Sequence, residues 1–207
     1  MSVRLKATCL ALVALAAIVS ARDLVAGRRI TAVRAMIEHS VPAGRDRLLA
    51  AGGASAAAAT PLEALARATL WIDQAAQATT MSERRRALDQ AEAMLAWVRT
   101  VRAEMPDATL LQVRADLVRF GQPRASTFAA FAQSYRQAGF LRQQGLWRLA
   151  FAVTYWPLLS AATHRAVIEE AIWLVRLDGR LRPVVDQLVA GTPPAVPIQL
   201  RLLERLR

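Results

Sequence analysis

The sequence predicts an all-α protein in which a series of amphipathic helices follows an apolar N-terminus. Apolar residues recur at helical spacing along the chain after residue 60, and no alternating, β-branched segment favours a strand. Capping signals are frequent, and proline or glycine separates most of the helical stretches. A chain of 207 residues has room for one domain and an accessory segment.

Residues 1–27 have the pattern of a signal-anchor or transmembrane segment. The basic stretch MSVRLK precedes an uninterrupted apolar run of 15 residues, Ala7 to Ala21. Fifteen residues suit a cleaved signal peptide, for which Val19–Ala21 supplies a small-residue cleavage site. With Leu24, Val25 and Ala26 added, the run approaches the length of a membrane helix. We expect an uncleaved anchor, and cleavage is the alternative.

The charges that flank this segment point to two different orientations. Arg4 and Lys6 precede it, which is the usual arrangement when the following chain is exported. Four arginines follow within a few turns, and the positive-inside rule would keep such a body in the cytoplasm. We expect a single-pass protein of a bacterial inner membrane with a periplasmic body, and the cytoplasmic orientation is the alternative.

Residues 28–60 are expected to connect the anchor to the body. Ile30, Val33 and Ile37 share one helical stripe before the SVPAG break. The low-complexity stretch AAGGASAAAAT, residues 50–60, predicts a flexible joint.

The body, residues 61–191, is predicted to consist of consecutive helices. Thr60-Pro61-Leu62-Glu63 combines a cap, a proline at the first helical position and a capping-box glutamate, which predicts a helix to about residue 78. Ser82 is expected to cap the next helix, which ends near residue 104. Further helices are expected at about 107–121, 125–138, 143–155, 163–177 and 182–190.

The C-terminal segment, residues 192–207, predicts one more amphipathic helix. Its apolar residues are expected to share one side, and they are Ile198, Leu202, Leu203 and Leu206.

Two helical pairs have the spacing of a degenerate repeat. Leu110, Val113, Leu117 and Gly121 precede Thr127, Phe131, Ser134 and Gly139, and the pattern resumes 36 residues after Leu110 at Leu146, Leu149 and Val153. This spacing resembles the tetratricopeptide repeat over about residues 61–191. The resemblance implies a TPR-like short α-solenoid, a scaffold that binds proteins and carries no catalytic residues.

The layout of the whole chain is similar to a second class of protein. A short apolar N-terminus, an arginine-rich helical body and the segments GLWRLAFAVTYWPLL and EEAIWLVRLD resemble small membrane-anchored proteins encoded in bacterial exopolysaccharide clusters. That resemblance implies an accessory role in polymer synthesis or export and protein partners in an envelope assembly complex.

The sequence contains none of the common signatures of an enzyme. It has no phosphate-binding loop and no nucleophile elbow, and its one cysteine, Cys9, lies in the apolar run. His164, Glu169 and Glu170 share a helix without metal-ligand spacing, so we expect a solvated helix face there. We therefore expect no catalytic residue, no metal site and no cofactor.

The distribution of charge is the most unusual feature of the body. The net charge is +11, and no acidic residue lies between Asp116 and Glu169. The arginines in this region are the candidate anion-binding or partner-binding face: Arg119, Arg124, Arg136, Arg142, Arg148 and Arg165. Four aromatic residues are candidate contacts, although their helical spacing favours core positions: Tyr135, Trp147, Tyr155 and Trp156.

These observations predict a non-catalytic, membrane-anchored helical scaffold, and the resemblance to proteins of exopolysaccharide clusters implies that it assists polysaccharide synthesis or export. Its basic face would contact an acidic polysaccharide, a membrane surface or an acidic protein. The alternative is a module on the cytoplasmic side that binds nucleic acid or anionic lipid, although the apolar N-terminus argues against nucleic acid.

Overall fold

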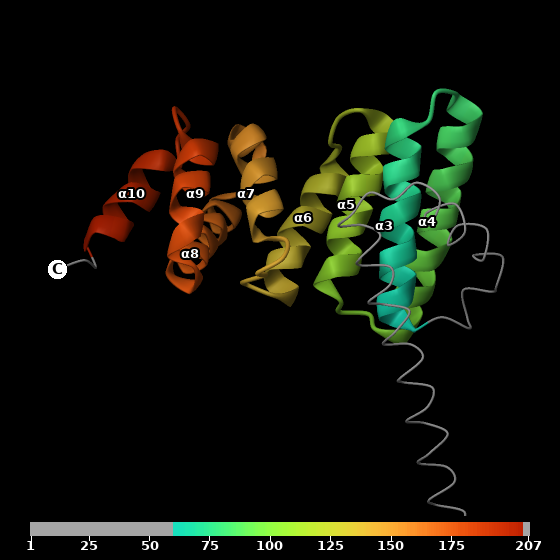
Figure 1. The fold of residues 1–207 in the computed structure, drawn as a ribbon, viewed down its shortest axis with the longest axis horizontal. Helices are drawn as coiled ribbons and strands as arrows, with labels where there is room; N and C mark the ends of the chain where they lie inside the picture. The colour runs from blue at the N-terminus through green and yellow to red at the C-terminus, as the bar shows by residue number, and fades with distance from the viewer. Residues whose placement is uncertain (1–59, 205–207) are drawn as a thin grey trace, which may run out of the picture. The chain divides into compact units, whose positions relative to one another are not determined.

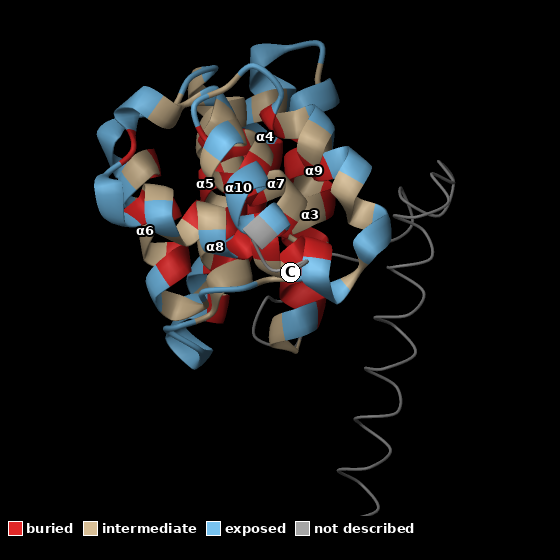
Figure 2. Ribbon diagram, turned by 90° about the vertical axis from the view of Figure 1, so that its left-hand side faces the viewer, coloured by how far each residue is buried: buried red, intermediate tan, exposed pale blue. Residues whose placement is uncertain are grey.

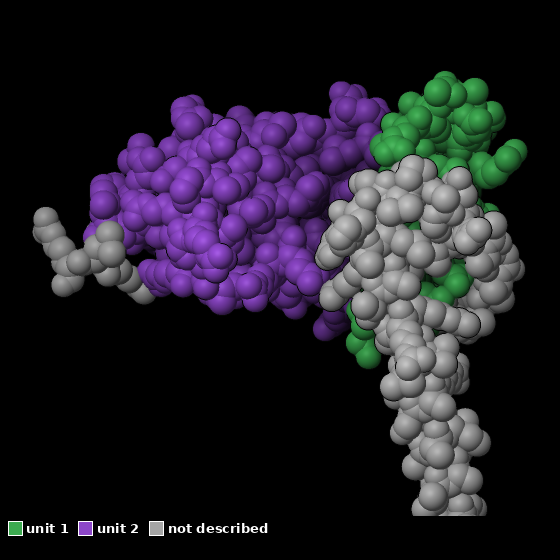
Figure 3. Space-filling model, in the orientation of Figure 1, with its two compact units in different colours: residues 1–103 green, residues 104–207 purple. Residues whose placement is uncertain are grey.

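A computed structural model describes residues 60–204, and its helices form two compact units, residues 1–103 and 104–207 (Figures 1 and 3). All regular structure in the described range is helical, which confirms the all-α prediction there. None of the helices between residues 60 and 204 combines the length and the apolar character needed to cross a bilayer. The predictions for residues 1–27 and 28–59 fall outside the described residues, and the division at residue 103 lies inside the expected domain 61–191.

The described part of unit 1 is a helical hairpin of α3 (Pro61–Gln77) and α4 (Met81–Val101). The two helices pack through a stripe of small residues, and the alanines buried in this hairpin are Ala64, Ala68, Ala75, Ala87 and Ala91. As predicted, Thr60 caps α3: its side-chain oxygen accepts a hydrogen bond from the backbone N–H of Glu63.

The cap of α4 differs from the prediction. Thr80, not Ser82, is the N-cap, because its hydroxyl accepts a hydrogen bond from the Glu83 N–H at 3.2 Å. The Glu83 carboxylate in turn accepts one from the Thr80 N–H at 3.2 Å, which completes a capping box. Ser82 is the second residue of the helix, so it lies past the cap position.

The Thr80→Ala substitution is expected to lower the free energy of unfolding by about 1 kcal/mol, because the Glu83 N–H loses its acceptor and the Glu83 carboxylate loses the hydrogen bond that Thr80 Oγ1 donates. Ser82→Ala is the matched control and should change stability by less than about 0.5 kcal/mol. Urea denaturation of the purified chain, followed by circular dichroism, measures both. Equal losses in the two variants would contradict this assignment of the cap.

Unit 2 is a series of helices that run in alternating directions (Figure 1). Its α-helices are α5 (Pro106–Phe120), α6 (Ala125–Gln137), α7 (Gly145–Thr154), α8 (Ala161–Leu177), α9 (Arg182–Val189) and α10 (Ala195–Glu204). Two short 3-10 turns, Trp156–Leu158 and Gly179–Leu181, precede α8 and α9 respectively. Five of the predicted helices are found here within about two residues of the expected bounds, and Gly121 ends α5 with a positive φ of 71° as a glycine C-cap requires.

The core of unit 2 is built on the residues that carry the repeat-like spacing. Leu110 and Val113 of α5 pack with Phe131 of α6, and Leu149 of α7 belongs to the same cluster. In Figure 2 the buried residues gather on the inward sides of these helices. A Cβ added to Gly145 would lie 2.7 Å from Leu174 Cδ1, so the start of α7 approaches α8 closely because it has no side chain there.

The C-terminal helix α10 buries only part of the predicted apolar side. Ile198 and Leu202 are buried in the core of unit 2, as expected from their spacing of one turn. Leu203 is exposed, so its predicted place on the buried side is wrong. One residue rotates the helix by about 100°, which carries position 203 away from the face shared by 198 and 202. Leu206 falls outside the described residues.

Candidate functional site

The six candidate arginines do not form one continuous face. Four of them are exposed, Arg119 is half-buried, and Arg148 is fully buried, so Arg148 cannot belong to an anion-binding surface. Because the helices alternate in direction, the five others divide between two ends of unit 2 (Figure 1). The arginine end, where α5 meets α6 and α7 meets α8, carries Arg119, Arg124 and Arg165. The opposite end, where α6 leads into α7, carries Arg136 and Arg142.

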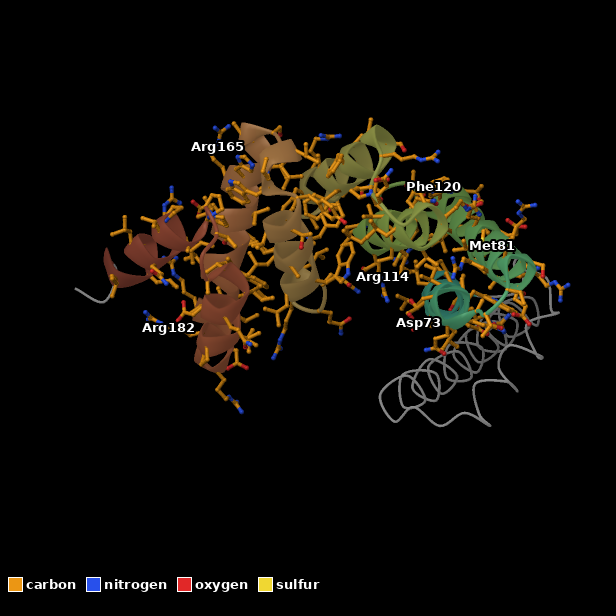
Figure 4. The ribbon with its side chains drawn as sticks, turned by 90° about the horizontal axis from the view of Figure 1, so that it is seen from above. Asp73, Met81, Arg114, Phe120, Arg165 and Arg182 are labelled. Atoms are coloured by element: carbon orange, nitrogen blue, oxygen red, sulfur yellow. The ribbon has the colours of Figure 1, made fainter. Side chains whose placement is uncertain are left out.

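The arginine end combines cationic groups with aromatic rings. The guanidinium carbon of Arg124 lies 3.4 Å from the centroid of the Phe120 ring, a cation–π contact at the surface. Seen from above, Phe120 and Arg165 lie along the same side of unit 2, whereas Arg114 and Arg182 lie along the other (Figure 4).

Trp156 and His164 complete the arginine end. Their rings stack with centroids 3.9 Å apart and planes 9° from parallel, and His164 Nε2 lies 2.8 Å from the Trp156 carbonyl oxygen. The prediction that His164 lies on a solvated helix face is therefore wrong, because its ring packs against the indole of Trp156.

Few carboxylates balance this end. Asp116 is the only acidic residue between Asp107 and Glu169 in the sequence. Its carboxylate accepts hydrogen bonds from Thr127 Oγ1 and from Gln112 Nε2, both at 3.1 Å, so it serves the α5–α6 contact. At the arginine end, Arg124 and Arg165 have no ion pair with a carboxylate among the described residues.

Arg148 and Glu170 form an ion pair in the interior of unit 2. Their side chains are 0% and 2% exposed, and Arg148 Nε lies 3.1 Å from Glu170 Oε2, although its N–H does not point at that oxygen. The guanidinium also donates to the carbonyl oxygens of Ala138 and Gly139, at 3.1 and 3.5 Å. No carboxylate lies near Arg148 in the sequence, and its ion-pair partner comes from another helix, α8.

The Glu170 carboxylate has two further donors. Tyr135 Oη donates to Oε2 at 2.9 Å, and the Leu141 backbone N–H donates to Oε1 at 2.8 Å. The Tyr135 ring lies under the guanidinium, with its centroid 3.4 Å from the Arg148 Cζ. We use the name buried clamp for this set of groups: the side chains of Arg148, Glu170 and Tyr135, the Leu141 N–H, and the carbonyl groups of residues 138 and 139. The prediction that Glu170 lies on a solvated helix face is wrong, because the residue is buried.

Burial dominates the protonation equilibria inside the buried clamp. Loss of hydration raises the pKa of Glu170, and the nearby Arg148 charge and the Leu141 N–H oppose this increase. Burial likewise raises the pKa of the Tyr135 hydroxyl, with the Glu170 charge acting in the same direction. At the start of α5, burial also raises the pKa of Asp107. Glu170 and Tyr135 are buried, so these two groups serve the fold rather than a reaction with solvent-borne substrate.

The four aromatic candidates are accounted for by packing. Tyr135 is buried in the clamp, and Trp147, Tyr155 and Trp156 pack against the core of unit 2. Phe151 lies at the centre of this cluster, with ring centroids 4.4 Å from Phe131, 5.6 Å from Trp147 and 5.0 Å from Tyr155. Their helical spacing did predict this core, as expected for an inward stripe.

Two features were missed by the sequence reasoning. Glu170 sits on the apolar stripe of α8 with Val167, Ala171 and Leu174, and this position signals burial. Phe140 stacks on Trp173 at the end opposite the arginine end, with centroids 5.3 Å apart. No spacing rule links residues 140 and 173, because their contact depends on how α8 packs beside the α6–α7 connection.

Within residues 60–204, no three histidine, cysteine or acidic side chains lie close enough together to hold a metal ion. Comparison with protein families, curated proteins and solved structures finds no match to this chain. Proposals about its function consequently depend on the sequence pattern and on the geometry of the two ends of unit 2.

Proposed function

We propose that the chain is a non-catalytic, membrane-anchored scaffold with a TPR-like repeat that assists polysaccharide synthesis or export. The consecutive antiparallel helices of unit 2, with small residues Thr127, Ser134 and Ala171 buried between them, support the repeat. The apolar N-terminal run supports the anchor. In this proposal the arginine end faces the periplasm and contacts an acidic polymer or an acidic partner.

The observation that carries the proposal is the arginine end itself. Arg124 and Arg165 are exposed, and no carboxylate contact is found for either side chain among the described residues. The Phe120 ring holds the Arg124 guanidinium in place, which lowers the entropy lost when an anion binds. Guanidinium groups fit carboxylate and phosphate oxygens in a bidentate manner, so an acidic polymer is a suitable ligand.

The experiment measures binding of a polyuronate to the purified full-length chain in detergent, with neutral dextran as the polymer control. Arg124→Glu combined with Arg165→Glu is expected to weaken binding on the order of tenfold at moderate salt. Arg136→Glu combined with Arg142→Glu, which changes the same charge at the opposite end, should have a much smaller effect. Equal effects of the two double variants, or no binding to the polyuronate, would refute the proposal.

A C-terminal alkaline phosphatase fusion tests the orientation of the body. Activity of the fusion on a membrane-bound chain is expected if the arginine end is exported. An inactive fusion on an expressed chain would instead support the alternative module on the cytoplasmic side. Tighter binding to single-stranded nucleic acid or to anionic vesicles than to the polyuronate, with a steep salt dependence, would identify the alternative ligand.

A further inference from the structure

The end of unit 2 opposite the arginine end presents a pair of stacked aromatic rings. Phe140, in the connection between α6 and α7, stacks on Trp173 of α8 with planes 21° apart. The Phe140 side chain is still 49% exposed, so one face of the stack meets solvent. We call Phe140 and Trp173 the aromatic platform. Exposed apolar groups that lie together, rather than singly, are candidate interaction surfaces.

The buried clamp fixes the backbone on both sides of Phe140. Arg148 binds the carbonyl oxygens of Ala138 and Gly139, and Glu170 accepts from the Leu141 N–H at 2.8 Å. The residues immediately before and after position 140 are therefore held by side chains that are closed to solvent. These bonds hold the backbone on both sides of Phe140, and stacking on Trp173 positions the ring, so the platform is formed without a ligand.

An exposed leucine and two exposed arginines lie close to the platform residues in the sequence. Leu177 follows Trp173 by one helical turn and is 46% exposed. Arg176 lies three residues after Trp173 and Arg142 two residues after Phe140, and both are exposed. Neither arginine has an ion pair with a carboxylate in the described part of the chain. Exposed aromatic and apolar residues with arginines close by in the chain are a composition that favours protein binding.

We propose that the aromatic platform is a docking site for an acidic segment of a partner protein, which places an aromatic or large apolar side chain on Phe140 and carboxylates on Arg142 and Arg176. Charge complementarity selects the acidic segment, because the platform is flanked by unpaired guanidinium groups. Exposed Leu177 favours a protein over a sugar, whose hydroxyl groups would lose hydrogen bonds to water against an aliphatic side chain. This surface is separate from the arginine end and goes beyond the proposed function.

The test uses the full-length chain in detergent and a fluorescein-labelled, glutamate-rich peptide of about a dozen residues with one central tryptophan. Fluorescence anisotropy should show saturable binding that weakens about tenfold with Phe140→Ala. It should also weaken when the peptide tryptophan is replaced by alanine, since the ring supplies the apolar contact. Arg142→Glu, which leaves the platform rings in place, should reduce binding and its dependence on salt.

Arg165→Glu is the matched control, because it changes an exposed arginine at the other end of the same unit and should leave peptide binding unchanged. An equal effect of Arg165→Glu, equal binding of the tryptophan and alanine peptides, or no binding would overturn the proposal. The proposal would also be overturned if anionic vesicles or the polyuronate bound more tightly than the peptide and Phe140→Ala abolished that binding. The platform would then be a site for that ligand. The Arg124→Glu/Arg165→Glu variant, which tests the proposed function, should bind the peptide normally, so the two proposals fail independently.

Discussion

Replacing Glu170 by glutamine is expected to lower the free energy of unfolding of unit 2 by about 3–5 kcal/mol, among the largest losses from any single substitution in this chain. The variant leaves the Arg148 guanidinium 0% exposed and without its carboxylate. Arginine cannot lose its proton inside a protein, so the charge stays buried. Urea denaturation monitored by tryptophan fluorescence measures the loss, since Trp147, Trp156 and Trp173 report on this unit.

Arg148→Met removes the other partner of the ion pair. Near pH 5 it should lower the free energy of unfolding by less than Glu170→Gln does, because Glu170 can bind a proton whereas arginine cannot release one. Burial raises the pKa of Glu170 in the folded chain, so the folded state holds more protons than the unfolded state above pH 4.5. The stability of Arg148→Met must then fall as the pH rises above 4.5, until the carboxyl group is ionised in the folded state as well.

The double variant Arg148→Met/Glu170→Gln completes the cycle and should recover most of the stability lost by Glu170→Gln. The glutamine carbonyl can still accept from the Leu141 N–H, and no buried charge remains. Additive losses from the two substitutions would show that the pair does not act as one unit.

Phe131→Ala is expected to lower the free energy of unfolding by about 3–5 kcal/mol, because it opens a cavity inside the aromatic cluster beside Phe151. The Phe131 ring is fully buried and lies between Phe151 and Tyr135, with centroids 4.4 and 5.5 Å away. Phe140→Ala is the matched control and should cost less than about 1.5 kcal/mol, since that ring gives up one stacking contact at the surface. Thermal and urea unfolding of both variants measure the difference, and similar losses would contradict the burial of Phe131.

The helices were predictable where a local signal sets the boundary. Thr60 followed by Pro61 and Glu63 determines the start of α3, and Gly121 determines the end of α5, because caps depend on a few neighbouring residues. The Thr80 cap was also readable, since Thr80 and Glu83 have the spacing of a capping box and Ser82 has no acidic partner three residues later. Ser160 similarly starts α8 two residues before the predicted position.

The buried clamp was not predictable to the same degree. Arginine is usually exposed unless a carboxylate from another part of the chain pairs with it. Local spacing in the sequence cannot show that Arg148 and Glu170 form such a pair. Their places on apolar stripes indicated burial, but the choice of partner depends on how α7 and α8 pack. The division of the remaining arginines between two ends follows from helix direction, which the repeat-like spacing of helical pairs does predict.

The position of Glu170 in the chain has a consequence for synthesis on the ribosome. Its hydrogen-bond partners Tyr135 and Leu141 precede it by 35 and 29 residues. A nascent chain that has emerged only as far as α7 therefore contains the guanidinium of Arg148 without the carboxylate that neutralises it. Helices α5 to α7 cannot enclose that charge together with its carboxylate until Glu170 has left the exit tunnel, so this part of the core of unit 2 is completed late in synthesis.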